Sequence, residues 1–240
     1  MSHRHEGFTV IELLIAIAIM GLVLPALYQF FLVASTEFVA QNGIIQMQSD
    51  ARAAMDVIVR ELRHSYGTPA LSTTVTPNDT ISFHRVEDTG RSTGGNTATT
   101  LNDTAKAWPE GAFAPSADGS YTLWIVTGTG ASQRRTILSH TATRLTLASA
   151  WGITPDATSL YTITRNKGFT RPSATENILS YRLGSTAEPA PLADHITALE
   201  FAQPDPQTVT ITLTARTQGI DPRTGQIRTY TLSETVRRRN

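Results

Sequence analysis

A long apolar run near the N-terminus constrains this chain more than any other feature of its sequence. Residues 13–34 read LLIAIAIMGLVLPALYQFFLVA, and Gln29 is the only strongly polar member. About 20 apolar residues are enough to cross a bilayer as a helix. A secretory signal has a shorter apolar core followed by a small-residue cleavage site. Here a short polar leader, MSHRHEG, precedes the run and a second helical pattern follows it. We therefore expect a transmembrane helix that is retained in the mature protein.

A carboxylate, Glu12, stands immediately before this run. An Asp at the centre of a membrane helix costs about 2.5–3.5 kcal/mol, and less near the end, so an acidic group at this place is expected to have a partner. No Lys or Arg occurs between Glu12 and Arg52, and Arg4 belongs to the leader. The partner is therefore not a basic side chain that follows nearby.

The segment Gly7-Phe8-Thr9-Val10-Ile11-Glu12-Leu13-Leu14 resembles the N-terminus of type IV pilins and type II secretion pseudopilins. The resemblance implies that a dedicated prepilin peptidase cleaves between Gly7 and Phe8 on the cytoplasmic side, and that the amine of Phe8 is then N-methylated. It also implies that Glu12 pairs with the terminal amine of a neighbouring subunit during assembly. Before assembly, Glu12 could pair with its own Phe8 amine across one helical turn. The alternative, in which Glu12 only marks the interfacial edge of a signal anchor, leaves the Gly-Phe-Thr context unexplained.

Gly21 and Pro25 interrupt the apolar helix four residues apart. Proline removes one helical hydrogen bond and its ring clashes with the previous turn, so we expect a kink or a locally unwound stretch here. The resemblance implies that such a stretch melts on filament assembly and that these two residues make the melting easier. A plain kink without functional consequence is the open alternative.

The segment 37–67 changes from an all-apolar pattern to an amphipathic one. Apolar residues recur at three- and four-residue intervals, which is typical of a helix with one buried stripe; they are Ile44, Met47, Ala51, Met55, Ile58, Leu62 and Tyr66. We expect this helix to pack on a sheet and to end at Gly67, before Thr68-Pro69. A coiled-coil surface is the weaker alternative, because the repeat covers only about three turns.

The remainder of the chain is rich in threonine, glycine and proline and is expected to form antiparallel strands with frequent turns. We assign 68–96 and 166–240 to one sheet, with strands at 80–86, 177–183, 196–202, 208–215 and 226–236. The segment 208–215 alternates cleanly, so Val209, Ile211 and Leu213 should face the helix and the threonines should face water. The stretch 89–104 shows no periodicity, and we expect it to be mobile.

Residues 97–165 are interpreted as an inserted small all-β domain. Strand-like runs in this segment are separated by glycine- or threonine-rich turns, and about 70 residues is a marginal but feasible size for a single core. The segment TRLTLASAW resembles small β modules of phage structural and surface proteins. The insert could bind a surface ligand or could merely enlarge the head. Together with a leader at 1–7, a membrane and filament-core helix at 8–36 and the amphipathic helix, the expected fold class is α+β.

The sequence offers no constellation typical of an enzyme, a cofactor or a metal. There is no cysteine and no phosphate loop, and the six histidines lack ligand spacing. The formal net charge is zero, which makes a nucleic-acid partner unlikely. Asp221-Pro-Arg-Thr-Gly225 is interpreted as a turn rather than a calcium loop, because it has one carboxylate. Arg237-Arg238-Arg239 is interpreted as a solvated terminus.

The segment PLADHITALEF and the helix MQSDARAAMDVIVRELR resemble PilW-like minor pilins and, more distantly, the larger minor pseudopilins of type II secretion. The expected function is that of a minor pilin subunit, processed by prepilin peptidase and assembled with other subunits in a priming or tip complex. Its N-terminus would lie in the cytoplasm, its helix in the inner membrane and its head in the periplasm or on a surface filament. A type II secretion pseudopilin is one alternative, and an adhesin or DNA-uptake pilin acting through 97–165 is another.

Overall fold

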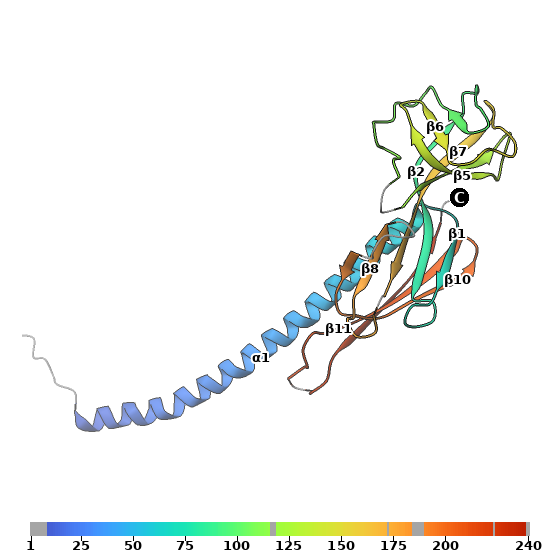
Figure 1. Ribbon diagram of the computed structural model, residues 1–240. Helices are drawn as coiled ribbons and strands as arrows, with labels where there is room; N and C mark the ends of the chain where they lie inside the picture. The colour runs from blue at the N-terminus through green and yellow to red at the C-terminus, as the bar shows by residue number, and fades with distance from the viewer. Residues whose placement is uncertain (1–8, 116–118, 172, 184–189, 223, 239–240) are drawn as a thin grey trace, which may run out of the picture. The chain divides into compact units, whose positions relative to one another are not determined.

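The computed structural model describes residues 9–115, 119–171, 173–183, 190–222 and 224–238. One helix, α1 (Val10–Arg63), is followed by twelve strands (Figure 1). The strands are β1 (Ser65–Ser72), β2 (Thr80–Arg91), β3 (Thr100–Asn102), β4 (Tyr121–Thr127), β5 (Arg134–His140), β6 (Arg144–Leu147), β7 (Leu160–Thr170), β8 (Leu179–Leu183), β9 (Ala190–Ala193), β10 (Ile196–Asp205), β11 (Thr208–Arg216) and β12 (Thr229–Arg237). This is an α+β fold with an additional small β domain, as the sequence predicts.

The chain divides into two compact units. The first contains the helix up to Gln46 and the loop Thr217–Arg228, which joins β11 to β12. The second contains the helix from Met47 onward and all strands. The two units are described separately below.

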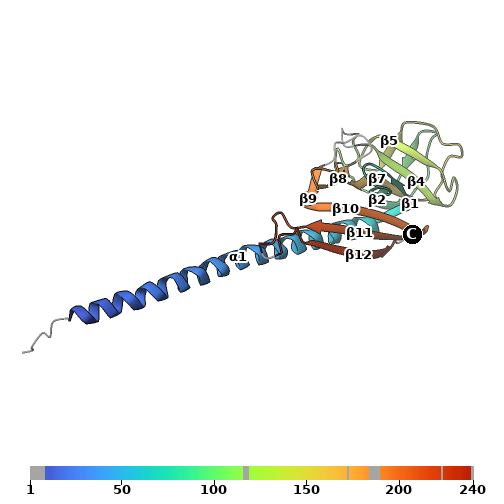
Figure 2. The ribbon, with the colours of Figure 1, turned by 90° about the horizontal axis from the view of Figure 1, so that it is seen from below.

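All paired strands of the second unit run antiparallel. The larger sheet has the order β1-β2-β7-β4-β5-β6-β3, with β8 on β7 and β9 on β8, and the smaller sheet has the order β10-β11-β12. The end of α1 lies beside the smaller sheet in both ribbon views (Figure 2). Ion pairs join it to both sheets, from Arg63 to Glu234 of β12 at 3.8 Å and from Glu61 to Arg85 of β2 at 3.0 Å.

The amphipathic pattern of the second helical segment is confirmed for Met47, Ala51, Met55, Ile58 and Leu62. Ile44 is only partly buried, and Tyr66 lies in β1 rather than in the helix. The buried helical residues are Met47, Ala51, Ala54, Met55, Ile58, Val59 and Leu62. Ala54 and Val59 are also buried and widen the stripe beyond the predicted positions.

The helix ends at Arg63, four residues before the predicted end at Gly67. The reason is strand pairing, since the carbonyl oxygen of His64 accepts a hydrogen bond from the amide of Val86 at 2.9 Å. Tyr66 then pairs with His84 within β1 and β2, where Gly67, with φ +70°, lies at an irregularity of the ladder. Competition from the β2 edge therefore outweighs the helical pattern of this segment.

The strand β11 matches its prediction closely. Val209, Ile211, Leu213 and Ala215 are buried, and the residues between them are partly exposed. The outward hydroxyls form a ladder with β12, in which Thr210 contacts Thr235 at 3.1 Å and Thr214 contacts Thr231 at 3.0 Å.

The stretch 89–104 is more regular than the expectation of a mobile segment. Residues 89–91 extend β2, and residues 100–102 form β3. Between them, side chains take over the hydrogen bonds that a strand ladder would supply. Asn96 donates to the carbonyl oxygen of Pro155 at 2.8 Å, and Asn102 donates to that of Gly95 at 2.6 Å. Such side chain–backbone bonds leave no hydrophobic periodicity in the sequence.

The C-terminal basic residues are not uniformly solvated, which corrects the sequence interpretation. Arg238 is buried, and its backbone amide donates to the carbonyl oxygen of Gln207 at 2.9 Å. Arg237 is exposed at the end of β12, and Arg239 lies outside the described residues.

The inserted domain has a hydrophobic core of its own. Its members come from β3 to β7 and from the loop before β4; they are Leu101, Trp108, Phe113, Leu123, Ile125, Ile137, Leu145, Leu147, Trp151, Tyr161 and Ile163. The strands β2 and β7 run through both the insert and the rest of the head, because they pair from Thr80–Thr170 to Arg91–Leu160. The register of this ribbon shifts between Val86 and Asp88.

Candidate assembly site on the N-terminal helix

The first turn of α1 is closed by a reciprocal cap. The backbone amide and the hydroxyl of Thr9 both donate to Oε2 of Glu12, at 3.0 Å and 2.9 Å. The amide of Glu12 in turn donates to Oγ1 of Thr9 at 3.3 Å. This arrangement is a capping box, in which two amides that lack helical partners are satisfied by side chains.

Thr9 is therefore a capping residue that the sequence analysis did not single out, although its signal is visible. The pattern Thr-x-x-Glu at 9–12 before an apolar run is the sequence signature of a capping box. Glu12 Oε2 accepts both Thr9 bonds, and no hydrogen bond to its Oε1 occurs among the described residues. Among the described residues, the cap therefore uses only one of the two oxygens of this carboxylate.

The predicted cleavage residues Gly7 and Phe8 lie outside the described residues, so the contact between Glu12 and the Phe8 amine stays a prediction. The cap is compatible with cleavage after Gly7, because the Thr9 amide belongs to the peptide bond that joins it to Phe8. Cleavage therefore leaves both donors of Thr9 in place.

The helix is continuous across Gly21 and Pro25. Pro25 lacks the amide that would bond to the carbonyl oxygen of Gly21, four residues earlier. A methyl group added at Gly21 would meet nothing within 4 Å, so the helix surface there is open. The structure contains no unwound turn at this place, and melting on assembly stays a prediction.

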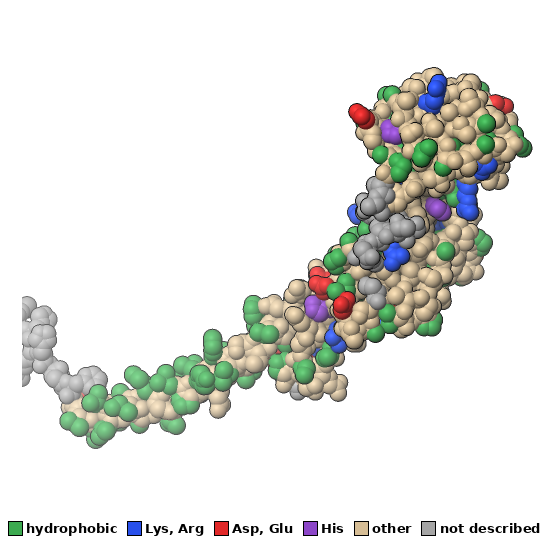
Figure 3. Space-filling view, viewed as in Figure 1, with side chains coloured by type: hydrophobic (Ala, Val, Ile, Leu, Met, Phe, Trp, Pro, Cys, Tyr) green, Lys and Arg blue, Asp and Glu red, His purple; other side chains and the backbone are tan. Residues whose placement is uncertain are grey.

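The helix surface around Glu12 is apolar and exposed. The large apolar side chains from Val10 to Val33 are 43–78% exposed, and they cover this part of the helix in the space-filling view (Figure 3). α1 is long and apolar enough to cross a membrane, with a mean hydropathy of 2.6 over its most apolar 18 residues, none of them buried. A surface of this kind is covered either by lipid or by other apolar helices.

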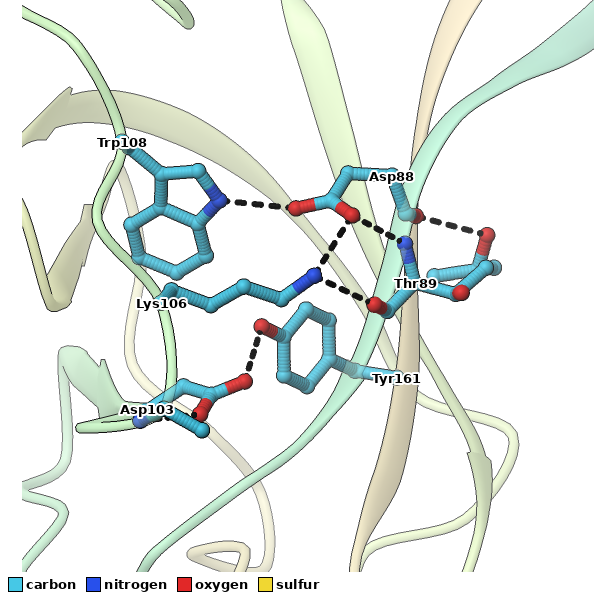
Figure 4. Close-up of polar contacts among 8 residues, drawn as sticks. Asp88, Thr89, Asp103, Lys106, Trp108 and Tyr161 are labelled. Atoms are coloured by element: carbon cyan, nitrogen blue, oxygen red, sulfur yellow. Dashed lines mark hydrogen bonds and ion pairs between the residues drawn. The ribbon is translucent and has the colours of Figure 1, made fainter.

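A second polar cluster joins β2 to the insert, and we call Asp88, Asp103, Lys106, Trp108 and Tyr161 the clasp (Figure 4). Nζ of Lys106 lies 2.7 Å from Oδ1 of Asp88, and Nε1 of Trp108 donates to Oδ2 at 2.7 Å. The hydroxyl of Tyr161 donates to Oδ2 of the buried Asp103 at 2.6 Å. The clasp ties the loop before β4 to β2 and β7.

The electrostatics of the clasp suit a structural role. Partial burial by itself raises the pKa of Asp88, but hydrogen bonds from Lys106 and Trp108 outweigh burial and hold the pKa below its usual value. Burial, followed by the hydrogen bond to Asp103, raises the pKa of Tyr161 and keeps its hydroxyl a donor. Gly90 is required beside them, because a methyl group there would lie 2.4 Å from the Tyr161 hydroxyl.

Within the part of the chain that the structure describes, no group of three or more His, Asp or Glu side chains could hold a metal ion. Asp221 instead pairs with Arg228, whose Nε lies 2.6 Å from Oδ2. The segment 221–225 closes a turn, since the amide of Gly225 donates to the carbonyl oxygen of Asp221 at 2.8 Å.

The capped carboxylate at the start of an exposed apolar helix is the arrangement expected of a prepilin-type N-terminus. Comparison with known families agrees, because residues 2–27 match the family described as the prokaryotic N-terminal methylation motif. Comparisons with curated proteins and with solved structures gave no match. The motif and the helix together support a type IV pilin-like protein, and they imply processing by prepilin peptidase and assembly with other pilins. The apolar helix is consistent with anchoring in the inner membrane.

Proposed function

We propose that this chain is a minor subunit of a type IV pilus-like filament. Prepilin peptidase removes residues 1–7, Phe8 is methylated, and the helix then leaves the inner membrane to pack beside other subunits in a priming or tip complex. The head lies on the periplasmic side before assembly. The chain performs no catalysis and is itself the substrate of the peptidase.

The observation that carries this proposal is the state of Glu12. Its Oε2 closes the first helical turn with Thr9, while its Oε1 points to no described donor on an otherwise apolar and exposed surface. A cationic amine from an adjoining subunit would fill this place. Charge-assisted hydrogen bonds are roughly twice as strong as neutral ones, and a low dielectric strengthens them further.

Two substitutions of Glu12 separate pairing from capping. Glu12→Gln keeps an oxygen that accepts from Thr9 but removes the charge, whereas Glu12→Ala removes both. We expect both variants to enter the membrane normally and to be absent from sheared surface filaments. Normal incorporation of Glu12→Gln would show that the negative charge is dispensable and would contradict the pairing.

A type II secretion pseudopilin is the first alternative, since such a subunit would share the motif and the helix. It would assemble only into a short periplasmic fibre, so recovery of the chain from sheared surface filaments separates the two. The second alternative is an adhesin or DNA-uptake pilin. The separate hydrophobic core of the insert favours it, because a self-contained module can be displayed without altering assembly.

A further inference from the structure

The apolar surface of α1 continues beyond the part that a bilayer can cover. Phe38, Val39 and Ile45 are 66%, 68% and 64% exposed. Residues 13–34 already extend about 33 Å at about 1.5 Å per residue, which fills a hydrocarbon core of about 30 Å. On the same scale Ile45 lies about 16 Å past Ala34. The hydrocarbon core therefore covers the membrane segment. Phe38 and Val39 lie about 6–8 Å past Ala34, at the level of the headgroups, and Ile45 lies beyond the bilayer.

A second apolar surface lies on the loop Thr217–Arg228, which belongs to the same compact unit. Ile220 is 62% exposed and Ile227 is 44% exposed. The loop lies beside the helix in both ribbon views. Ile220 and Ile227 of the loop thus remain exposed to solvent although α1 lies beside the loop.

The loop is held in one shape by polar contacts. Nη2 of Arg228 lies 2.5 Å from Oδ2 of Asp221, and the amide of Asp221 donates to the carbonyl oxygen of Gln226 at 2.9 Å. At the base, the amide of Thr217 donates to the carbonyl oxygen of Arg228 at 2.9 Å. The Asp221–Arg228 pair brings together the two positions that follow the isoleucines, and a loop ordered in advance loses little entropy on binding.

We propose that Ile220 and Ile227 dock on the α1 stripe Phe38, Val39 and Ile45 of a neighbouring copy of this chain. The inference rests on the proposed function, because it requires a filament. Both surfaces occur on one chain and neither covers the other. Pairing the loop of one subunit with the stripe of the next is therefore a heterologous contact, which repeats along a filament. The contact of Glu12 with a neighbouring amine would position the N-terminal end of the helix. The contact between the loop and the stripe would position the part of the helix that lies outside the membrane.

A photocrosslinking amino acid at position 227 tests this docking in the full chain, expressed in native membranes with its assembly system. Thr224, exposed on the same loop, is the matched control position. We expect adducts at 227 that mass spectrometry maps to α1 of a second copy of this chain, at least about tenfold above those at 224; adducts with a different subunit would contradict the docking. Adducts with lipid, adducts with an unrelated protein, or equal yields at both positions would overturn the proposal.

A double substitution, Ile220→Ser with Ile227→Ser, gives an independent test because it leaves Asp221 and Arg228 in place. We expect its incorporation into filaments to fall about tenfold or more relative to Thr224→Ser, with an unchanged unfolding transition. The same samples report the N-terminus of the chain. A processed, incorporated chain with no effect of the double substitution contradicts the docking alone, whereas an unprocessed chain contradicts the proposed function.

Discussion

At the scale of single residues, buried polar groups are hydrogen-bonded beside the hydrophobic core of the insert. The clasp shows this best, because Asp103 is only 2% exposed and its Oδ2 receives the Tyr161 hydroxyl. A buried acceptor that loses its donor costs about 1–3 kcal/mol. Removing one oxygen atom from Tyr161 should therefore have a measurable effect although the ring stays.

Tyr161→Phe is expected to lower the free energy of unfolding by about 1–3 kcal/mol. Denaturant unfolding of the full chain in detergent, followed by tryptophan fluorescence, measures the change. Tyr121→Phe is the matched control, since the described residues provide no hydrogen bond to the Tyr121 hydroxyl. Equal stabilities of the two variants would show that the Tyr161–Asp103 bond contributes nothing.

His84 should make the stability of the head depend on pH. Burial, and then the charge of Arg134, lower the pKa of His84, and its Nδ1 has no hydrogen-bond partner among the described residues. The unfolded chain therefore takes up a proton near pH 6.5 while the folded chain does not. The stability due to neutral His84 is complete above that pH and declines as the pH falls toward the lower folded value.

His84→Phe keeps a ring against Trp124, whose centroid lies 5.3 Å from that of His84, and cannot take up a proton. We expect the wild-type chain to lose more stability than this variant between about pH 7 and pH 5. Thermal unfolding at a series of pH values provides the comparison. Parallel curves for the two proteins would exclude His84 as the source of the dependence.

At the scale of elements, the sequence predicts those parts whose periodicity is undisturbed. The strand β11 and the helical stripe from Met47 to Leu62 follow from alternating and three-to-four spacing, because burial on one face decides both. The end of α1 could not be predicted, since His64 and Ser65 are taken up by pairing with the distant strand β2. The stretch 89–104 could not be predicted either, because its order depends on Asn96 and Asn102 side chains. Among the candidate site residues, the assembly role of Glu12 stays a prediction from the motif, while the contact between Thr9 and Glu12 required the helix start to be considered as a cap.

The ribbon of β2 and β7 predicts how the insert can be removed. Val86 pairs with Thr164, just before the register shift, so an Asn-Gly turn in place of residues 87–163 should close a hairpin there. We expect this shortened chain to unfold cooperatively, because Ile81, Phe83 and Phe169 of the remaining core are retained. Deleting 97–165 instead leaves residues 89–91 of β2 without the β7 partners Leu160, Tyr161 and Thr162. Aggregation of the shortened chain would show that the head depends on the insert.

At the scale of the whole molecule, the two halves of the chain meet different demands. The exposed apolar surface of α1 can be covered by lipid or by other apolar helices. The head has its own hydrophobic cores and, because the chain lacks cysteine, no disulfide stabilises it. If the shortened chain still enters filaments, the insert is a displayed module. If it folds but fails to assemble, the insert is part of the filament contact.

The N-terminus of the chain in native membranes is the most direct measurement, because the cap and the second Glu12 oxygen matter only if processing uncovers an amine four residues earlier. Mass spectrometry of the N-terminal peptide is expected to give a chain that begins at N-methylated Phe8. A chain that still carries Met1, or one cut downstream of Ala34, would contradict the account.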